Sequence, residues 1–252
     1  MEKVELESKK GYKIKCQMSL PVTSEIKSYM IACHGFAADK ESSTILELSD
    51  KLKQYKISTI SFDFMGHGES EVNSEKLSID SCVDDLETVY DYIISKDANT
   101  SISIFASSFG AYVSLICIRK KNKRFENIIL RCTAIEMDYI FENELINGSL
   151  ENMVEVGYTY AGFNNMKVSH GFYNELKEYN IHQIYKNKEI CALMIHGDKD
   201  DVAPIEHIIK FAEEHREGIT LEVIKDAGHR FKNEGESEKV LELTMNYINR
   251  NK

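Results

Sequence analysis

The sequence has no tryptophan, only two prolines among its 252 residues, and no uninterrupted run of about 18 apolar residues. A helix that crosses a bilayer needs such a run, so we expect no integral membrane segment. Cations are also scarce, since 31 Lys and Arg stand against 41 Asp and Glu and give a net charge of −10. Nucleic-acid binding depends on neutralising phosphates, so we do not expect a nucleic acid as partner.

Paired cysteine motifs are missing as well. The six cysteines form no CxxC pair and mostly have apolar neighbours; they are Cys16, Cys33, Cys82, Cys117, Cys132 and Cys191. We therefore expect reduced core thiols, which are typical of a cytoplasmic protein. The first seven residues alternate charged and apolar side chains, unlike the apolar centre of a signal peptide. Both observations predict a cytoplasmic location.

Apolar runs alternate with helical patterns along most of the chain. Strands are predicted at residues 12–20, 29–33, 58–62, 101–106, 127–132, 190–195 and 219–224, and helices at 41–55, 79–94, 109–120, 205–215 and 237–249. Several strands are apolar throughout, as in a parallel sheet covered on both faces. The fold class predicted is therefore α/β, with a mostly parallel central sheet, helices on both faces and antiparallel pairing at the first edge.

One segment interrupts this alternation. About 55 residues separate the strands at 127–132 and 190–195, whereas such connections usually have about 2 to 6 residues. The segment contains many aromatic residues and four glycines, which favours short helices joined by turns. We predict a cap at residues 135–189, inserted between strands 6 and 7 of a core formed by residues 1–134 and 190–252.

A candidate nucleophile lies between the strand at 101–106 and the helix at 109–120. A serine on a sharp strand-to-helix turn needs small residues two positions before and after it, because the two backbones approach closely there. Ser108 has Ala106 and Gly110 at these positions, whereas Ser107 would have two phenylalanines. Ser108 is thus the candidate, with a simple helix N-cap as the alternative interpretation.

Three further elements follow strands at the same edge of the predicted sheet. Phe36, in the loop after the strand at 29–33, is expected to offer a backbone N–H to an oxyanion together with the N–H of Phe109. Asp200 follows the strand at 190–195 and His229 follows the last strand. The pattern predicts that His229 contacts Ser108 and that Asp200 orients the imidazole.

Five ordered segments resemble the α/β-hydrolase superfamily: His34-Gly35-Phe36, residues 63–70 (DFMGHGES), residues 107–110 (SSFG), residues 196–200 (HGDKD) and Ala227-Gly228-His229. They are most similar to capped bacterial serine esterases related to feruloyl and cinnamoyl esterases, and to the monoacylglycerol lipase and serine aminopeptidase group. The chain order Ser108, Asp200, His229 is also that of α/β hydrolases. The resemblance implies an α/β-hydrolase fold and a serine hydrolase. Ala106 departs from the glycine usual in the superfamily.

Several assignments stay open in the sequence. Asp201 and Asp198 lie in the same loop as Asp200, and Glu136 and Asp138 follow the strand at 127–132, where some relatives place the acid. We favour Asp200, because it lies four residues before Pro204 as in related loops. The other candidate bases are His34, His67 and His196, which we expect to bond backbone or stabilise turns. No histidine pair has metal-ligand spacing with a supporting carboxylate, so no metal and no cofactor are predicted.

The predicted reaction is hydrolysis of a carboxylic ester through an acyl-enzyme on Ser108. Residues 135–189 have nine acids against four lysines, so an acidic approach and a small to medium, neutral, apolar or aromatic acyl group are expected. The candidate substrate residues are aromatic residues of the cap, namely Tyr158, Tyr160, Phe163 and Phe172. A thioesterase or an aminopeptidase on the same triad is the alternative, and a non-catalytic ligand-binding protein the third possibility. The sequence makes no prediction of oligomeric state.

Overall fold

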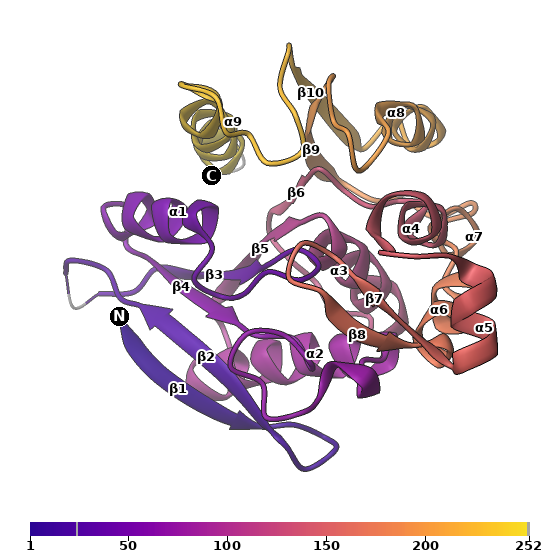
Figure 1. The fold of residues 1–252 in the computed structure, drawn as a ribbon. Coiled ribbons are helices and arrows are strands. Elements are labelled where there is room, and N and C mark those ends of the chain that lie inside the picture. The colour runs from indigo at the N-terminus through magenta and orange to yellow at the C-terminus, as the bar shows by residue number, and fades with distance from the viewer. Residues whose placement is uncertain (24, 251–252) are drawn as a thin grey trace.

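An eight-stranded sheet forms the centre of the structure, a computed structural model that describes residues 1–23 and 25–250 (Figure 1). The spatial order is β1-β2-β4-β3-β5-β6-β9-β10. The strands are β1 (Glu2–Glu7), β2 (Lys13–Ser19), β3 (Ser28–Cys33), β4 (Ile57–Phe62), β5 (Ser101–Ser107), β6 (Ile128–Arg131), β9 (Ala192–Gly197) and β10 (Ile219–Ile224). β2 pairs antiparallel with β1 and β4, and the other neighbours are parallel. The predicted, mostly parallel sheet with an antiparallel edge is confirmed.

The burial of the strands explains which of them the sequence predicted. Every residue of β4 and β9 is buried, as expected for strands covered on both faces. β1 was not among the predicted strands. Of its six residues only Leu6 is buried, so an edge strand of this kind has no apolar run from which to predict it.

Five long helices cover the two faces of the sheet. They are α1 (Ser43–Lys53), α2 (Ile79–Lys96), α3 (Phe109–Lys120), α8 (Ile205–Glu214) and α9 (Glu236–Arg250), and each lies within a few residues of its predicted range. Leu48 of α1 and Val240 of α9 belong to one apolar cluster, whereas α2, α3 and α8 contribute to the other. The helices therefore lie on both faces, α1 and α9 on one and α2, α3 and α8 on the other (Figure 1).

The segment between β6 and β9, residues 135–189, combines short helices with a hairpin. It contains α4 (Met137–Ile140), a π-helical turn η2 (Phe141–Leu145), α5 (Leu150–Val156), β7 (Tyr158–Ala161), β8 (Met166–Ser169), α6 (His170–Glu178) and α7 (Ile181–Ile184). The antiparallel pair β7 and β8 was not predicted. Its turn uses Gly162 and Asn165 at φ of +72° and +54°, and asparagine and glycine are the residues that tolerate this region best.

This segment, which we call the β6–β9 segment, packs on three parts of the sheet layer. The Ser74 hydroxyl in the short helix η1 (Ser74–Lys76) donates to the Lys167 carbonyl at 2.8 Å. The Tyr112 hydroxyl of α3 donates to the Tyr179 carbonyl at 3.0 Å. The Phe36 ring stacks on Phe172, with 6.1 Å between ring centres. The segment is thus attached to α3 and to the loops after β3 and β4.

Within residues 1–23 and 25–250, no helix combines the length and the apolar character that crossing a bilayer requires.

A buried carboxyl group supports the loop after β4 from the side of α2. Asp85 is fully buried, and its two oxygens accept hydrogen bonds from the Tyr12 hydroxyl at 2.5 Å and from the Met65 N–H at 2.9 Å. Burial raises the pKa of Asp85 to about 7, and the two hydrogen bonds oppose this effect in part. An aspartate has a pKa of about 3.9 in an unfolded chain. The folded state therefore holds the proton of Asp85 more tightly than the unfolded state does. The stabilisation that results is present in acid and is lost as the pH rises from about 4 towards 7.

We expect Asp85→Asn to become more favourable for stability, relative to the wild type, as the pH rises. The asparagine keeps both contacts, since its carbonyl can accept from Met65 and its amide can donate to Tyr12, but it does not titrate. Between pH 5 and pH 8 the difference in free energy of unfolding should shift by about 3 kcal/mol in favour of the variant. Urea unfolding at the two pH values measures it, with the exposed Asp50→Asn as control. An equal difference at both pH values would contradict the raised pKa.

Candidate active site

Ser108 occupies a strained turn between β5 and α3. Its backbone has φ of 51° and ψ of −114°, a region that residues with a side chain rarely adopt. Its N–H donates to the Arg131 carbonyl at 2.8 Å. A methyl group on Gly110 would lie 2.4 Å from the His34 carbonyl oxygen, so α3 can approach β3 only with glycine there. The small residues predicted around Ser108 thus have a steric reason.

The structure brings Ser108, His229 and Asp200 into one hydrogen-bonded series. His229 Nε2 lies 3.1 Å from Ser108 Oγ. His229 Nδ1 lies 2.9 and 2.8 Å from the two carboxylate oxygens of Asp200. With Nδ1 protonated and facing the carboxylate, Nε2 presents its lone pair to the hydroxyl.

Asp200 is held by its own loop as well as by His229. Its Oδ1 accepts hydrogen bonds from the N–H groups of Val202 at 2.9 Å and Ala203 at 2.7 Å. His196 Nε2 lies 3.2 Å from Oδ2. Burial alone raises the pKa of Asp200, but the hydrogen bond and charge of His229 outweigh it, so the pKa lies below its usual value. The carboxylate therefore stays ionised beside the imidazole.

The other candidate acids have different surroundings. Asp198 Oδ1 accepts the Asp226 N–H at 2.6 Å, and Asp201 is exposed. Glu136 and Asp138 line a separate hollow, where Glu136 pairs with Lys210 at 3.4 Å. None of these four carboxylates hydrogen-bonds His229 in the part of the chain that the structure describes.

The other candidate bases bond to the backbone. His34 Nδ1 lies 2.8 Å from the Gly35 carbonyl, and its Nε2 accepts the Phe64 N–H at 3.1 Å. His67 Nδ1 lies 3.1 Å from the Met65 carbonyl, and burial lowers its pKa to about 3. His196 Nε2 lies 2.8 Å from the Ala203 carbonyl. Each of these imidazoles is engaged by its own loop, and the imidazole that contacts Ser108 Oγ is that of His229.

The two predicted backbone donors, Phe36 and Phe109, belong to segments that adjoin Ser108. Phe109 follows it as the first residue of α3, and the Phe36 and Phe109 rings are 5.8 Å apart at 79°. A methyl group on Gly35 would lie 3.5 Å from Ser108 Cβ, which places the loop after β3 against the nucleophile. Among the hydrogen bonds of the described residues, none uses the N–H of Phe36 or of Phe109. Both donors are available to a ligand.

A cavity of about 590 Å³ opens beside Ser108 and His229. It is lined from three directions: by the loop after β3 and the start of α1, by the ends of β5 and β6, and by the β6–β9 segment with the loops after β9 and β10. The lining residues are Gly35, Phe36, Ala38, Ser42, Ser43, Thr44, Ser107, Ser108, Arg131, Glu144, Leu145, Asn147, Gly162, Phe163, Val202, His229, Arg230 and Lys232.

Comparison with known families decides the classification. Residues 24–158, more than half of the chain, match the family model described as serine aminopeptidase, S33. The chain belongs to this family of α/β hydrolases. The expected superfamily and fold class are thereby confirmed.

Solved structures of α/β hydrolases extend the similarity in fold over the whole chain. Est1E from Butyrivibrio proteoclasticus with bound ferulic acid has 19% sequence identity and a TM-score of 0.81, covering 98% of this chain and 99% of that chain. Alpha/beta hydrolase domain-containing protein 10 from mouse has 14% identity and a TM-score of 0.76, covering 99% of each chain. GrgF from Penicillium sp. sh18 has 15% identity and a TM-score of 0.79, covering 99% and 98%. No curated protein matches the sequence.

The aromatic residues predicted to bind substrate have separate places in this α/β hydrolase. Phe163 lines the cavity, with the Arg230 guanidinium 4.8 Å above its ring. Phe172 is buried, and its ring contacts those of Phe36 and Phe109; it is not among the cavity-lining residues. Tyr158 and Tyr160 belong to β7 and contact each other, and neither is among the cavity-lining residues. Of the four, Phe163 alone borders the space beside Ser108.

The cavity also contains residues that the sequence did not indicate. Arg131 ends β6, and Ser42, Ser43 and Thr44 begin α1, but no motif distinguishes them. Arg230 follows the candidate base His229 directly, and this adjacency in the sequence could have indicated that Arg230 lies close to the site. Glu144, Leu145, Asn147 and Gly162 of the β6–β9 segment also line the cavity, although the sequence proposed only aromatic residues of this segment.

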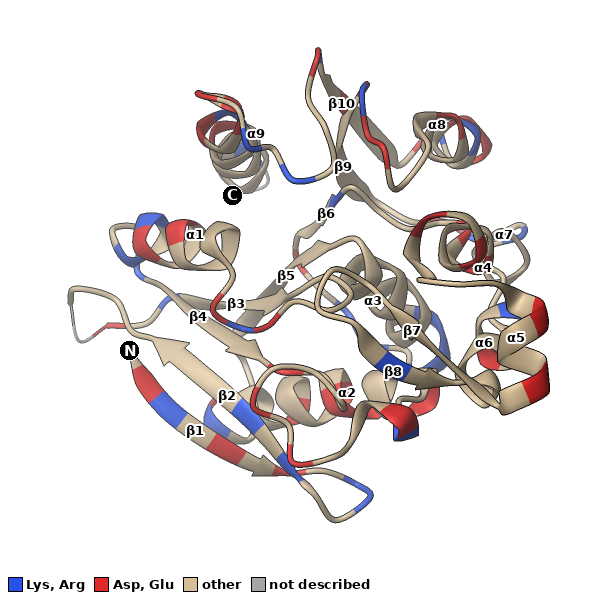
Figure 2. Ribbon diagram, viewed as in Figure 1, with Lys and Arg blue, Asp and Glu red and all other residues tan. Residues whose placement is uncertain are grey.

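The predicted acidic approach does not extend to the cavity lining. Glu144 is the one carboxylate there, against Arg131, Arg230 and Lys232. Glu144 belongs to the β6–β9 segment, but the other acids of this segment are not among the lining residues; Glu151 and Glu155, for example, are exposed on α5, which lies at the edge of the molecule in Figure 2. Charge summed over the segment therefore gave the wrong sign for the cavity, because an α-helix directs most of its charged side chains away from the packed face.

One group of side chains among the described residues has metal-like proximity. Cys132, His196 and Asp200 have ligand atoms within 4.8 Å of one another. His196 Nε2, the nitrogen facing Asp200, donates to the Ala203 carbonyl at 2.8 Å, so it presents a proton and not a lone pair. The three side chains are close together because His196 and Cys132 pack around the Asp200 carboxylate. All six cysteines are free, five of them buried, and Cys191 is exposed.

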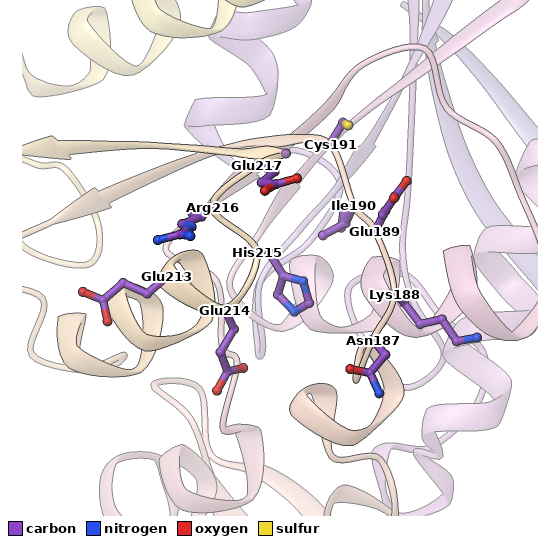
Figure 3. Close-up of a pocket in the computed structure, with 11 residues that line it drawn as sticks. Asn187, Lys188, Glu189, Ile190, Cys191, Glu213, Glu214, His215, Arg216 and Glu217 are labelled. Carbon is purple, nitrogen blue, oxygen red and sulfur yellow. The ribbon is translucent and has the colours of Figure 1, made fainter.

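A third hollow lies at the amino ends of the parallel strands and takes no part in this site. It is lined by residues 187–191, before β9, and by residues 213–218, at the end of α8 and in the turn that follows (Figure 3). Because the parallel strands all run the same way, the start of β9 lies at the far end from Ser108. His215 and Cys191 are its reactive side chains, and in Figure 3 they lie on separate strands of chain.

Removal of the serine side chain should reveal the strain of the turn. Ser108→Gly and Ser108→Ala both lose the hydroxyl, but glycine alone adopts a positive φ without penalty. We expect the glycine variant to be more stable than the alanine variant by about 1 kcal/mol, as measured by chemical denaturation. At an ordinary helix position the glycine variant is the less stable of the two. If the glycine variant is also the less stable one at position 108, the turn is not strained.

Proposed function

We propose that this α/β hydrolase is a serine esterase that cleaves carboxylic esters through an acyl-enzyme on Ser108. The observation that carries the proposal is the series of contacts from Ser108 Oγ to His229 Nε2 at 3.1 Å and from His229 Nδ1 to Asp200 at 2.8 Å. Its members come from three separate loops, and none of the contacts is needed to complete a helix or strand. A nucleophile, a base and an orienting acid in this order are typical of acyl transfer.

In the first half of the reaction, Ser108 Oγ attacks the ester carbonyl while His229 Nε2 takes its proton. The negative charge that develops on the carbonyl oxygen is stabilised by the N–H groups of Phe36 and Phe109. The ester C–O bond then breaks, and the imidazolium gives its proton to the leaving alcohol. The products of this half are the free alcohol and an acyl-enzyme on Ser108.

In the second half, water repeats the attack on the acyl-enzyme. His229 removes a proton from the water, and the same two N–H groups stabilise the second oxyanion. The bond to Ser108 Oγ breaks, the hydroxyl regains its proton from the imidazolium, and the carboxylic acid leaves. Asp200 stabilises the imidazolium in both halves without taking the proton.

The cavity supports a small to medium substrate. Its volume of about 590 Å³ is within the range of small-molecule sites. Phe36, Leu145, Phe163 and Val202 provide apolar contact for an apolar or aromatic acyl group. We further propose that residues 135–189 act as a cap on a core of residues 1–134 and 190–252. The six free thiols favour a cytoplasmic location.

A thioester or a peptide could use the same three residues. An aminopeptidase must hold a free α-amino group, for which carboxylates are the suitable partners. The cavity offers Glu144 together with three cations, which disfavours a cationic substrate. We therefore favour an ester over a peptide as the substrate.

A fluorophosphonate probe should label the wild type and not Ser108→Ala, because the probe reacts with activated serines. The labelled protein should hydrolyse nitrophenyl esters, with an optimum among acyl chains shorter than palmitoyl. Feruloyl esters, acyl thioesters and aminoacyl anilides in the same panel separate the alternatives. Labelling that survives Ser108→Ala would exclude Ser108 as nucleophile, and a wild type that neither reacts nor hydrolyses would identify a ligand-binding protein.

Asp200→Asn should lower kcat by about 10⁴-fold, since the asparagine favours the wrong tautomer of His229. The matched control is Asp198→Asn in the same loop, which keeps its oxygen for the Asp226 N–H and should change kcat by less than about threefold. Steady-state kinetics on the best nitrophenyl ester compare the two. Similar losses in both variants would mean that the loop, and not the Asp200 carboxylate, is responsible.

A further inference from the structure

Arg131 is a buried cation in the wall of the cavity. It is 7% exposed and lies at the end of β6, and its carbonyl accepts the Ser108 N–H at 2.8 Å. One nitrogen of its guanidinium, Nη2, donates to the His229 carbonyl at 3.1 Å, and the group lies 4.7 Å above the Phe231 ring. Neither of these two contacts supplies a negative charge to the guanidinium.

The guanidinium lacks the partner that buried arginines usually have. Its Nε is buried without a hydrogen-bond acceptor, and no carboxylate of residues 1–23 and 25–250 forms an ion pair with it. Burial lowers the pKa of Arg131, and the nearby Asp200 opposes this, but arginine remains charged in proteins. An unpaired buried charge is costly. Such a group in the wall of a ligand cavity is suited to bind an anion.

Other parts of the cavity favour an anion too. Arg230 and Lys232 line it, and Glu144 is the one opposing carboxylate. Ser42, Ser43 and Thr44 line it at the start of α1, an 11-residue helix whose N-cap Ser42 makes no side-chain capping bond. The first N–H groups of a helix have no partner within it and carry a partial positive charge.

We propose that the substrate is an ester that also carries a carboxylate, and that Arg131 binds this carboxylate while Ser108 attacks the ester carbonyl. The proposal rests on the proposed esterase function and replaces the expectation of a wholly neutral substrate. A planar guanidinium suits a planar carboxylate, and Arg131 is among the residues that line the cavity. The apolar residues Leu145 and Phe163 contact the rest of the molecule, and Arg230 and Lys232 attract it from solution.

The test uses two pairs of esters, each with one charged and one neutral member of nearly the same shape. In the first pair, 4-butyryloxybenzoate and 4-butyryloxybenzamide, the carboxylate is on the leaving alcohol. In the second pair, monomethyl glutarate and its carboxamide analogue, it is on the acyl group. The wild type should prefer the charged member of one pair by about tenfold or more in kcat/KM, and the pair concerned locates the carboxylate.

Arg131→Gln should reduce this preference to about one, whereas Arg131→Lys should keep part of it. A purely structural role for Arg131, in holding the His229 carbonyl, would slow both members of a pair equally and leave the ratio unchanged. Arg216→Gln removes the same charge at the opposite edge of the sheet and is the matched control. If Arg131→Gln does not fold, the exposed double variant Arg230→Gln/Lys232→Gln should still lower the preference.

Binding without turnover separates this proposal from the esterase function. In Ser108→Ala, 4-hydroxybenzoate or the unhydrolysed monomethyl glutarate should raise Tm more than 4-hydroxybenzamide or the carboxamide analogue of monomethyl glutarate does, and Arg131→Gln in the same background should abolish the difference. Equal kcat/KM within both pairs, or a preference that survives Arg131→Gln, would overturn the carboxylate site. Failure of the esterase function appears differently, as absence of probe labelling and of hydrolysis of every ester.

Discussion

The close approach of α3 to β3 around Ser108 is the constraint on which the site depends. Gly110 permits it, because any side chain there would collide with the His34 carbonyl. The same approach holds Ser108 at a positive φ and places the Phe36 loop against it. Strain at such a turn persists only where surrounding contacts over-determine it, and the Arg131 carbonyl that accepts the Ser108 N–H is one of them.

The remaining side chains of the site are positioned by loops at the same edge of the sheet. Asp200 is held by two N–H groups of its own loop and by His196, so the carboxylate has its orientation before His229 is considered. His229 in turn is attached to the sheet through its carbonyl, which accepts from Arg131. Hydrogen bonds of this kind pre-organise a site, so that little rearrangement is needed during reaction.

Charge is distributed very differently in the cavity and in the chain as a whole. The chain as a whole has a net charge of −10, and Figure 2 shows its acidic residues spread over many helices and strands; exposed charges are screened by solvent and salt. The cavity wall has a buried arginine and two further cations against one carboxylate. A partly desolvated charge acts more strongly on a ligand than an exposed one, so the sign inside the cavity matters more for the substrate than the sign outside.

Seven of the eight strands of the central sheet, the five long helices and the candidate residues Ser108, Asp200 and His229 could be predicted from the sequence. These predictions follow from local rules: continuous apolar runs for buried strands, small residues around a sharp turn, and polar residues directly after strands. The aromatic residue that borders the cavity, the hairpin in the β6–β9 segment and the burial of Arg131 beside the nucleophile became evident from the three-dimensional contacts alone. Burial and cavity contacts depend on residues that are far apart in the chain. No local sequence pattern shows whether a residue at the end of a strand, such as Arg131, will face a cavity.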